Sequence, residues 1–491
     1  MFIQKALISI LLSPLNTLMK KLPQKLRDAM FITGGAGLAV HFFMYLSRIA
    51  SYRFLYFFVI SCVFLGLVIL GSLGGDIKPV RFRKILFLPM AATGLFMVVS
   101  SFINNVDYLP DAMLLLVAFP ILYICWGNAD RTHLTRLLLK VNKYALVLFI
   151  LLSFLFTKIT PRQYCGFSGN QNATAYFLST AVVMVVCDIM YQRKFTVKTA
   201  FDILLSGIAF ALIYYTNSRS GMLAVIFSLS LGTVVFLVSH SKKEILSFAV
   251  KFGATALCAA ICAGTLLYVF QLRQWLPIPY YSVFDKDFDM DERWEELFSP
   301  KPDTPDLPDT PDQPDTPDSP DSPDQPDSPD NDGSGQFFDG SGFSDINKDK
   351  LDTTDKTADN FSTGRISVWK AYAKDLNLFG HESTPEVYIP IIYKDIKSTH
   401  MTILQIAYES GIFAGVSYLV LNIASGILAI IYAVRHRSEK YALLPLLVIA
   451  AFGVLSMLMS CRVTFWYYST LMYYFALAPL MVRDVKAPSE K

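Results

Sequence analysis

Twelve long apolar runs constrain this chain more than any other feature of its sequence. A bilayer core of ~30 Å requires roughly 20 apolar residues per helix. Runs of this kind begin near Ala29, Tyr52, Lys84, Pro110, Lys143, Asn172, Thr199, Arg219, Ile245, Ile412, Tyr441 and Val463. With 53% hydrophobic and only 17% charged residues among 491, the chain is too apolar for a soluble enzyme of this size. The sequence predicts an all-α polytopic integral membrane protein with about 12 transmembrane helices.

The distribution of lysine and arginine among the connecting loops predicts the orientation. Cytoplasmic loops retain these residues. If the N-terminus is cytoplasmic, the inside segments hold 24 of them and the short outside loops hold 6. We therefore expect a multi-pass protein with both termini cytoplasmic. The short apolar run from Ala6 is interrupted by Pro14, and we interpret it as an interfacial or re-entrant segment rather than a signal peptide.

A long polar segment separates two groups of spans. Residues 1–270 carry spans 1–9 and residues 403–491 carry spans 10–12, so the segment 271–402 is expected to be a large extracytoplasmic loop. It holds 28 acidic against 12 basic residues. Residues 302–330 repeat Pro-Asp-x ten times, which predicts a disordered, stiff spacer reaching roughly 90 Å in polyproline II conformation. Residues 361–402 are expected to form amphipathic helices that return to the membrane.

Two acidic stretches in this loop resemble cation-binding loops. Aspartates alternate from Asp285, with Glu296 at the twelfth position, but the sixth is Met290 instead of the glycine that an EF-hand requires. A similar pattern from Asp345 is broken by Lys350. We interpret both as solvated linker and leave weak calcium binding open. No cofactor or metal site is predicted, and the basic residues do not form the soluble face that binds nucleic acid.

The first of three polar motifs is the predicted outer turn 216–221, with the sequence TNSRSG. Its Arg219 opens an apolar helix, which is costly unless the side chain faces a cavity or a partner. Backbone N–H groups at a helix N-terminus also favour anions. Arg219 is therefore a candidate anion-binding residue. The alternative is an interfacial anchor whose charged end reaches the headgroups.

The second motif covers residues 362–372, with the sequence STGRISVWKAY. Ser362 or Thr363 can cap the helix, and Arg365, Trp369 and Tyr372 then share one face. A planar cation beside two aromatic rings suits a sugar phosphate, because the guanidinium group binds phosphate through two hydrogen bonds while the rings stack on the sugar. The alternative is an amphipathic helix lying on the membrane surface.

The third motif, residues 398–411, predicts a capped helix with His400 in its first turn. Histidine titrates near neutrality and can accept a proton from an attacking hydroxyl group. The alternative role for a lone histidine is structural hydrogen bonding. Glu409 to Gly411 are interpreted as the turn into the tenth span.

Taken together, these motifs resemble the bacterial O-antigen ligase and surface polysaccharide polymerase family. The resemblance rests on SRSG at 218–221, GRxxxW leading to LFGH at 364–381, and TH…LQxxxESGIxxG at 399–415. The GxxxNxN pattern at 166–172 is similar to an outer loop of that family. The likeness covers roughly 160–430, and the first five spans match only in hydropathy. The sequence departs from the family where His-Asn is replaced by His400-Met401, and the Pro-Asp repeat is an insertion.

The resemblance implies a GT-C-like fold and a glycosyltransferase of the bacterial cytoplasmic membrane that is inverting and metal-independent. Its donor would be an undecaprenyl-diphosphate-linked glycan and its acceptor a glycan or glycolipid hydroxyl, at the outer face of the lipid bilayer. Arg219 and Arg365 would bind the diphosphate, and His400 would orient or deprotonate the acceptor. The other implied substrate-binding residues are Trp369, Tyr372, Asn170, Asn172 and His381, and His381 is also an alternative for the role of His400.

Two other interpretations stay open at this point. A transporter or flippase of a lipid-linked oligosaccharide would also have many spans and membrane-embedded arginines, although transporters usually bind substrate near the bilayer midplane. A sensor or structural protein would explain the acidic loop but not the two arginines and the histidine. Within the transferase hypothesis, polymerase and ligase share these motifs, and the long spacer favours polymerase slightly.

Overall fold

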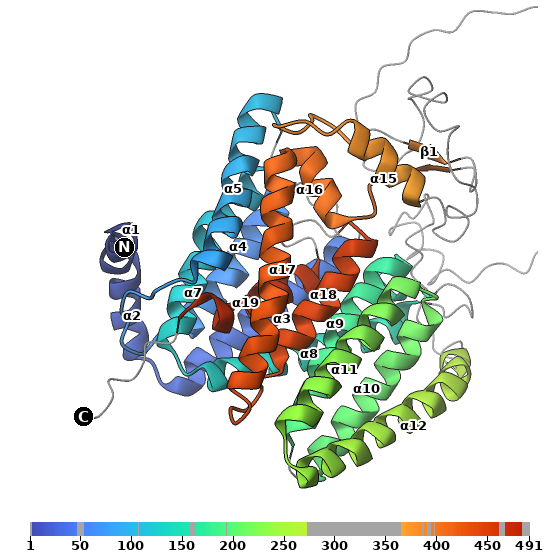
Figure 1. Ribbon diagram of the computed structural model, residues 1–491. Helices are drawn as coiled ribbons and strands as arrows, with labels where there is room; N and C mark the ends of the chain where they lie inside the picture. Colours follow the sequence, from blue (N-terminus) through green and yellow to red (C-terminus); the bar gives the residue numbers. More distant parts are fainter. Residues whose placement is uncertain are drawn as a thin grey trace, which may run out of the picture. The chain divides into compact units, whose positions relative to one another are not determined.

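The chain is seen here as a computed structural model (Figure 1). Contacts divide it into two units, Met1–Phe284 with Asn347–Lys491, and Asp285–Ile346. The described residues all belong to the first unit: 2–46, 54–106, 108–157, 164–192, 194–272, 365–384, 387–389, 394–396, 398–460 and 467–483. The Pro-Asp repeat, both calcium-like stretches and the predicted caps Ser362 and Thr363 lie outside this part of the chain.

Each of the twelve predicted membrane runs contains a helix. The single helices are α3 (Gln24–Leu46), α4 (Phe54–Gly71), α5 (Lys84–Asn104), α8 (Arg131–Phe156), α9 (Gln171–Tyr191), α10 (Val197–Tyr215), α11 (Arg219–Ser239), α12 (Lys242–Leu272), α17 (Ile412–Arg435), α18 (Leu444–Leu458) and α19 (Tyr468–Met481). Eight stretches of the described chain are long and apolar enough to cross a bilayer, including the composite helix Leu109–Asn128. The chain is therefore a multi-pass membrane protein, and twelve spans stay a prediction.

Two helices contain a π-helical turn just before a proline. The first runs through α1 (Phe2–Leu7), η1 (Ile8–Leu12) and α2 (Ser13–Lys20), and the second through α6 (Leu109–Met113), η2 (Leu114–Ala118) and α7 (Phe119–Asn128). Pro14 and Pro120 each follow the π turn by two residues. Because proline has no N–H and its ring clashes with the carbonyl four residues earlier, the preceding turn widens.

The segment between α12 and α17 departs from the all-α expectation. It contains α15 (Arg365–Lys374) and α16 (Thr402–Ser410), and also a pair of short antiparallel strands. Strand β1 (Val387–Ile389) pairs with β2 (Lys394–Ile396), with Val387 opposite Ile396. Strands of three residues are too short for an alternating pattern to reveal, so the sequence prediction missed them.

Helix α9 forms the centre of the bundle and is buried along its whole membrane window. It packs against α8, α10, α11, α18 and α19 (Figure 1). Polar side chains fix these contacts: Ser179 Oγ donates to the Gly221 carbonyl of α11 (3.0 Å), and Asn142 Nδ2 of α8 donates to the Ala181 carbonyl (3.0 Å). Buried side-chain hydrogen bonds of this kind set the register between neighbouring membrane helices.

Loops that the sequence assigns to the same side of the membrane contact one another. On the predicted cytoplasmic side, here called the basic end, Arg83 N donates to the Met481 carbonyl (2.8 Å). His133 Nε2 there lies 2.9 Å from Asp28 Oδ1. On the other side, here called the motif end, Tyr164 N donates to the Tyr215 carbonyl (3.0 Å). The three motifs of the sequence analysis all belong to the motif end.

Candidate functional site at the motif end

Arg219 is the first residue of α11, as predicted, and its side chain is exposed. The turn before it is held by Thr216, whose hydroxyl donates to the Ile213 carbonyl (2.6 Å), and by Ser218, which caps the Gly221 N–H. A Cβ at Gly221 would lie 2.8 Å from Cβ of Ala175 in α9. Glycine therefore lets the start of α11 approach the central helix, which leaves Arg219 at the surface of the motif end.

Asn170 and Asn172 support this turn from the neighbouring helix. Asn170 caps α9, because its Oδ1 accepts from Asn172 N (2.8 Å) and Ala173 N (3.2 Å). The Asn172 side chain accepts from Ser218 Oγ (3.4 Å). Both asparagines thus have structural partners in this arrangement, and Asn172 connects the 166–172 loop to the arginine turn.

Arg365 begins the described part of α15 and is half-buried. Burial lowers the pKa of its guanidinium group, nearby Tyr176 opposes this shift, and the positive charge of Arg219 lowers the pKa further. Arginine still stays protonated in proteins. In the described part of the chain, neither Arg219 nor Arg365 forms an ion pair with a carboxylate. Two cations that interact electrostatically, with no acidic partner among the described residues, form a site that favours an anion.

Trp369 and Tyr372 lie on the inward face of α15. The Trp369 indole donates from Nε1 to the Thr399 carbonyl (2.8 Å), which ties α15 to the loop that carries His400. Tyr372 is buried and packs edge to face on Tyr408 of α16, with ring centroids 4.9 Å apart. The ring of Tyr372 is enclosed by protein, so of the two rings predicted to stack on a sugar only the half-buried Trp369 is partly accessible.

His400 does not occupy the first turn of a helix, which corrects the sequence prediction. Helix α16 begins at Thr402, and its N-cap residue Met401 makes no side-chain cap. His400 itself has a φ of +50°, a left-handed conformation that a helix cannot continue. Side chains hold it there: Ser398 Oγ accepts from His400 N (3.3 Å), and Thr399 Oγ1 donates to the Met401 carbonyl (2.8 Å). His400 therefore lies in a constrained loop and is half-buried.

The end of α18 connects the arginine turn to the histidine loop. Ser220 Oγ donates to Sδ of Met459 (3.1 Å), and Thr402 Oγ1 donates to the Met459 carbonyl (2.9 Å). The hydroxyl oxygens of Ser398 and Ser460 lie 2.7 Å apart. The turn that carries Arg219 and the loop that carries His400 are thus both held against the end of α18. The hydrogen bond from Trp369 to the Thr399 carbonyl connects α15, which carries Arg365, to the same loop.

His381 lies in a separate cluster beneath α16. Its Nδ1 lies 3.0 Å from the Tyr408 carbonyl, its Nε2 lies 3.6 Å from Asp375 Oδ2, and its ring stacks on Tyr408 with centroids 3.9 Å apart. Two left-handed glycines close this cluster, Gly380 at φ +85° and Gly411 at φ +94°. These contacts indicate that His381 fixes the position of α16.

The sequence predicts a turn at Glu409, whereas the structure shows this residue as a buried carboxylate in the last turn of α16. Gln405 Nε2 donates to Glu409 Oε1 (2.6 Å), and Gln405 Oε1 accepts from Thr399 N (2.9 Å), next to His400. The i, i+4 spacing of Gln405 and Glu409 indicates that the two side chains can contact each other on a helix, but it does not indicate that they are buried. Among the described residues, no group of three or more His, Cys, Asp or Glu side chains is arranged to hold a metal ion.

Comparison with known proteins does not identify a relative. No family model matches the chain, and no curated protein or solved structure matches it.

Proposed function

We propose that this protein is an integral membrane glycosyltransferase of the O-antigen ligase or polysaccharide polymerase type. It transfers or polymerises an undecaprenyl-diphosphate-linked glycan onto a hydroxyl acceptor at the outer face of the bacterial cytoplasmic membrane. Under this proposal the chain has twelve spans, a GT-C-like fold, both termini in the cytoplasm and the motif end outside. The motif resemblance and the excess of lysine and arginine at the basic end support it.

The observation that carries the proposal is the pairing of Arg219 with Arg365. Two guanidinium groups from distant parts of the chain are close enough to interact electrostatically, and one of them is half-buried. Placing like charges together is unfavourable unless a ligand supplies negative charge. A diphosphate leaving group develops negative charge as its bond to the sugar breaks, and preorganised donors there contribute ~10²–10³ in rate each.

The chemistry is a displacement at the anomeric carbon. The acceptor hydroxyl oxygen forms a bond to this carbon while the bond from the carbon to the diphosphate oxygen breaks, and the electron pair leaves with the diphosphate. His400 takes the proton of the attacking hydroxyl, and Trp369 supports the histidine loop and offers its ring to the sugar. Arg219 and Arg365 bind the departing diphosphate.

Carrier linkage of the surface glycan tests this function in cells. Cells that contain only the native protein should make long glycan polymer or transfer it to an acceptor. Cells that contain only the His400→Ala variant should accumulate glycan on the lipid carrier. Single repeat units on the carrier would indicate a polymerase, which the long spacer favours, and full-length polymer on the carrier would indicate a ligase. Unchanged glycan length and linkage would remove His400 from the mechanism and favour the transporter alternative.

A further inference from the structure

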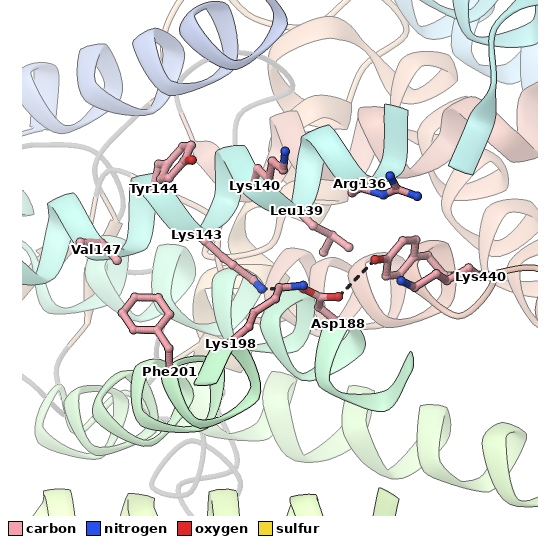
Figure 2. A pocket seen from close by; sticks show the side chains of 11 residues that line it. Arg136, Leu139, Lys140, Lys143, Tyr144, Val147, Asp188, Lys198, Phe201 and Lys440 are labelled. Carbon is pink, nitrogen blue, oxygen red and sulfur yellow. Dashed lines mark hydrogen bonds and ion pairs between the residues drawn. The ribbon is translucent and has the colours of Figure 1, made fainter. Parts of the chain in front are cut away.

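The basic end contains a pocket that the proposed chemistry does not use (Figure 2). It has a volume of about 390 Å³ and is lined by α8, α9, α10 and the segment 440–441 between α17 and α18. This volume falls within the range of small-molecule pockets in proteins, ~300–1,000 Å³. Five of the eleven lining residues are lysine or arginine, and only one is acidic.

The inner wall of the pocket is a closed ionic network around Asp188, which is 3% exposed. Its Oδ2 lies 2.5 Å from Lys143 Nζ and 2.9 Å from Lys198 Nζ, and its Oδ1 accepts from the Tyr441 hydroxyl (3.2 Å). Lys143 also contacts Asp202 (2.7 Å). These charges are balanced within the protein, so the inner wall is a fixed scaffold and its lysines are already occupied.

Three further cations line the same pocket outside this network. Arg136 and Lys140 lie one turn apart on α8, and Lys440 comes from the segment before α18 (Figure 2). Arg136 and Lys140 are exposed, and in the described part of the chain neither forms an ion pair. Lys440 Nζ lies 4.9 Å from the centroid of the Tyr441 ring, and Lys140 interacts electrostatically with Asp28 of α3. With five basic residues against one carboxylate in its lining, the pocket presents an excess of positive charge around its opening.

An apolar wall continues from these cations toward the middle of the spans. Along one face of α8, Arg136 and Lys140 are followed by Tyr144 and Val147, and the helix rises roughly 16 Å from the first to the last of them. Phe201 of α10 lies on the same pocket. Tyr144 is 55% exposed and Phe201 is 48% exposed, so this wall faces the surroundings of the bundle.

We propose that this pocket binds an anionic phospholipid, with its phosphate at Arg136, Lys140 and Lys440 and its acyl chain along Tyr144, Val147 and Phe201. The order of charged and apolar groups is that of a phospholipid entering from the membrane interface, and basic pockets between membrane helices bind such headgroups. A free phosphate would use only the cationic half of the pocket. The inference does not depend on the proposed transferase activity.

The bound lipid joins four elements that meet at the pocket, so it stabilises the bundle by mass action. The test uses the detergent-purified full chain and follows its thermal midpoint during titration with phosphatidylglycerol. Matched titrations use phosphatidylcholine with the same acyl chains and glycerol phosphate without acyl chains. The variant Arg136→Gln/Lys140→Gln removes two exposed charges of the pocket. The control Lys242→Gln/Lys243→Gln removes two exposed charges from the start of α12, outside the pocket.

Phosphatidylglycerol should raise the midpoint of the native and control proteins, and the pocket variant should need roughly 10- to 30-fold more lipid for the same shift. Phe201→Ser should also weaken the response. An equal response of native protein and pocket variant would overturn the proposal, as would phosphatidylcholine acting as strongly as phosphatidylglycerol. Glycerol phosphate matching the lipid would assign the pocket to a free phosphate and overturn the lipid assignment.

Discussion

Arg365 lies close enough to Arg219 at the motif end for the positive charge of Arg219 to add to the effect of burial, and both lower the pKa of Arg365. The two residues come from α15 and from the start of α11, and the sequence between them contains α12 and most of the long polar segment that follows it. Because no carboxylate of the described chain pairs with either group, a bound anion would relieve their repulsion.

Replacing either arginine should therefore abolish transfer without unfolding the protein. We expect Arg219→Ala and Arg365→Ala each to lower the transfer rate ~10²–10³-fold, because each removes a donor to the leaving group. Arg365→Lys should recover part of the rate, since a lysine keeps the charge but loses the two-pronged geometry. Lys370→Ala, an exposed position on the same helix, is the control. A native transfer rate in both alanine variants would contradict the assignment of diphosphate binding to Arg219 and Arg365.

The left-handed glycines beneath α16 should be intolerant of a side chain. A Cβ at Gly380 would collide with the Glu409 carbonyl, and its φ of +85° strains any other residue. We expect Gly380→Ala to lower the thermal midpoint of the purified protein clearly. Gly426→Ala is the matched control, because nothing lies within 4 Å of its added Cβ in α17. Equal midpoints for the two variants would contradict the packing of the 377–381 loop against α16.

Trp369 should act mainly by holding the histidine loop. Trp369→Phe keeps an aromatic ring but loses the hydrogen bond to the Thr399 carbonyl. A hydrogen bond of this kind contributes ~0.5–1.5 kcal/mol, so the transfer rate should fall roughly 2- to 10-fold. A phenylalanine variant as inactive as Arg365→Ala would show instead that the indole N–H contacts substrate directly.

The buried network at the basic end should be more sensitive than a surface ion pair of the same type. Asp188→Asn leaves Lys143 with one acidic partner and Lys198 with none, and breaking a buried pair costs ~3–5 kcal/mol. Asp76→Asn removes the exposed pair with Lys20 and should leave the thermal midpoint unchanged. The measurement is the thermal midpoint of unfolding of both variants in the same detergent. Similar midpoints would show that the network is not structural.

Deleting the Pro-Asp repeat should leave the chemistry intact. Residues 302–330 have almost no apolar side chains and cannot contribute a core. The deletion variant should insert into the membrane and transfer glycan at the native rate. An inserted but inactive variant would assign the repeat a functional contact.

The apolar runs predicted the membrane helices well because hydropathy and length decide where a helix can cross a bilayer. The run expected near Asn172 is α9, which begins at Gln171. The sequence also predicted that Arg219 opens a helix, because an apolar run begins directly after a turn. These features depend on neighbouring residues in the chain.

The features that the sequence did not reveal depend on distant contacts. The left-handed conformation of His400 follows from hydrogen bonds of Ser398 and Thr399, and the strands β1 and β2 are too short to show a period. The network of Lys143 with Asp188 and Asp202 joins three helices that hydropathy treats separately. Tyr372 was assigned to a sugar from its spacing, although the packing of α15 on α16 encloses it.

The most direct test is transfer by the purified full chain in liposomes, supplied with an undecaprenyl-diphosphate-linked glycan and a glycan acceptor. The native protein should consume donor, release undecaprenyl diphosphate and form one new glycosidic bond for each donor consumed, and Arg365→Ala should do none of these. Donor that crosses the bilayer without any new glycosidic bond would contradict the transferase account and identify the protein as a transporter.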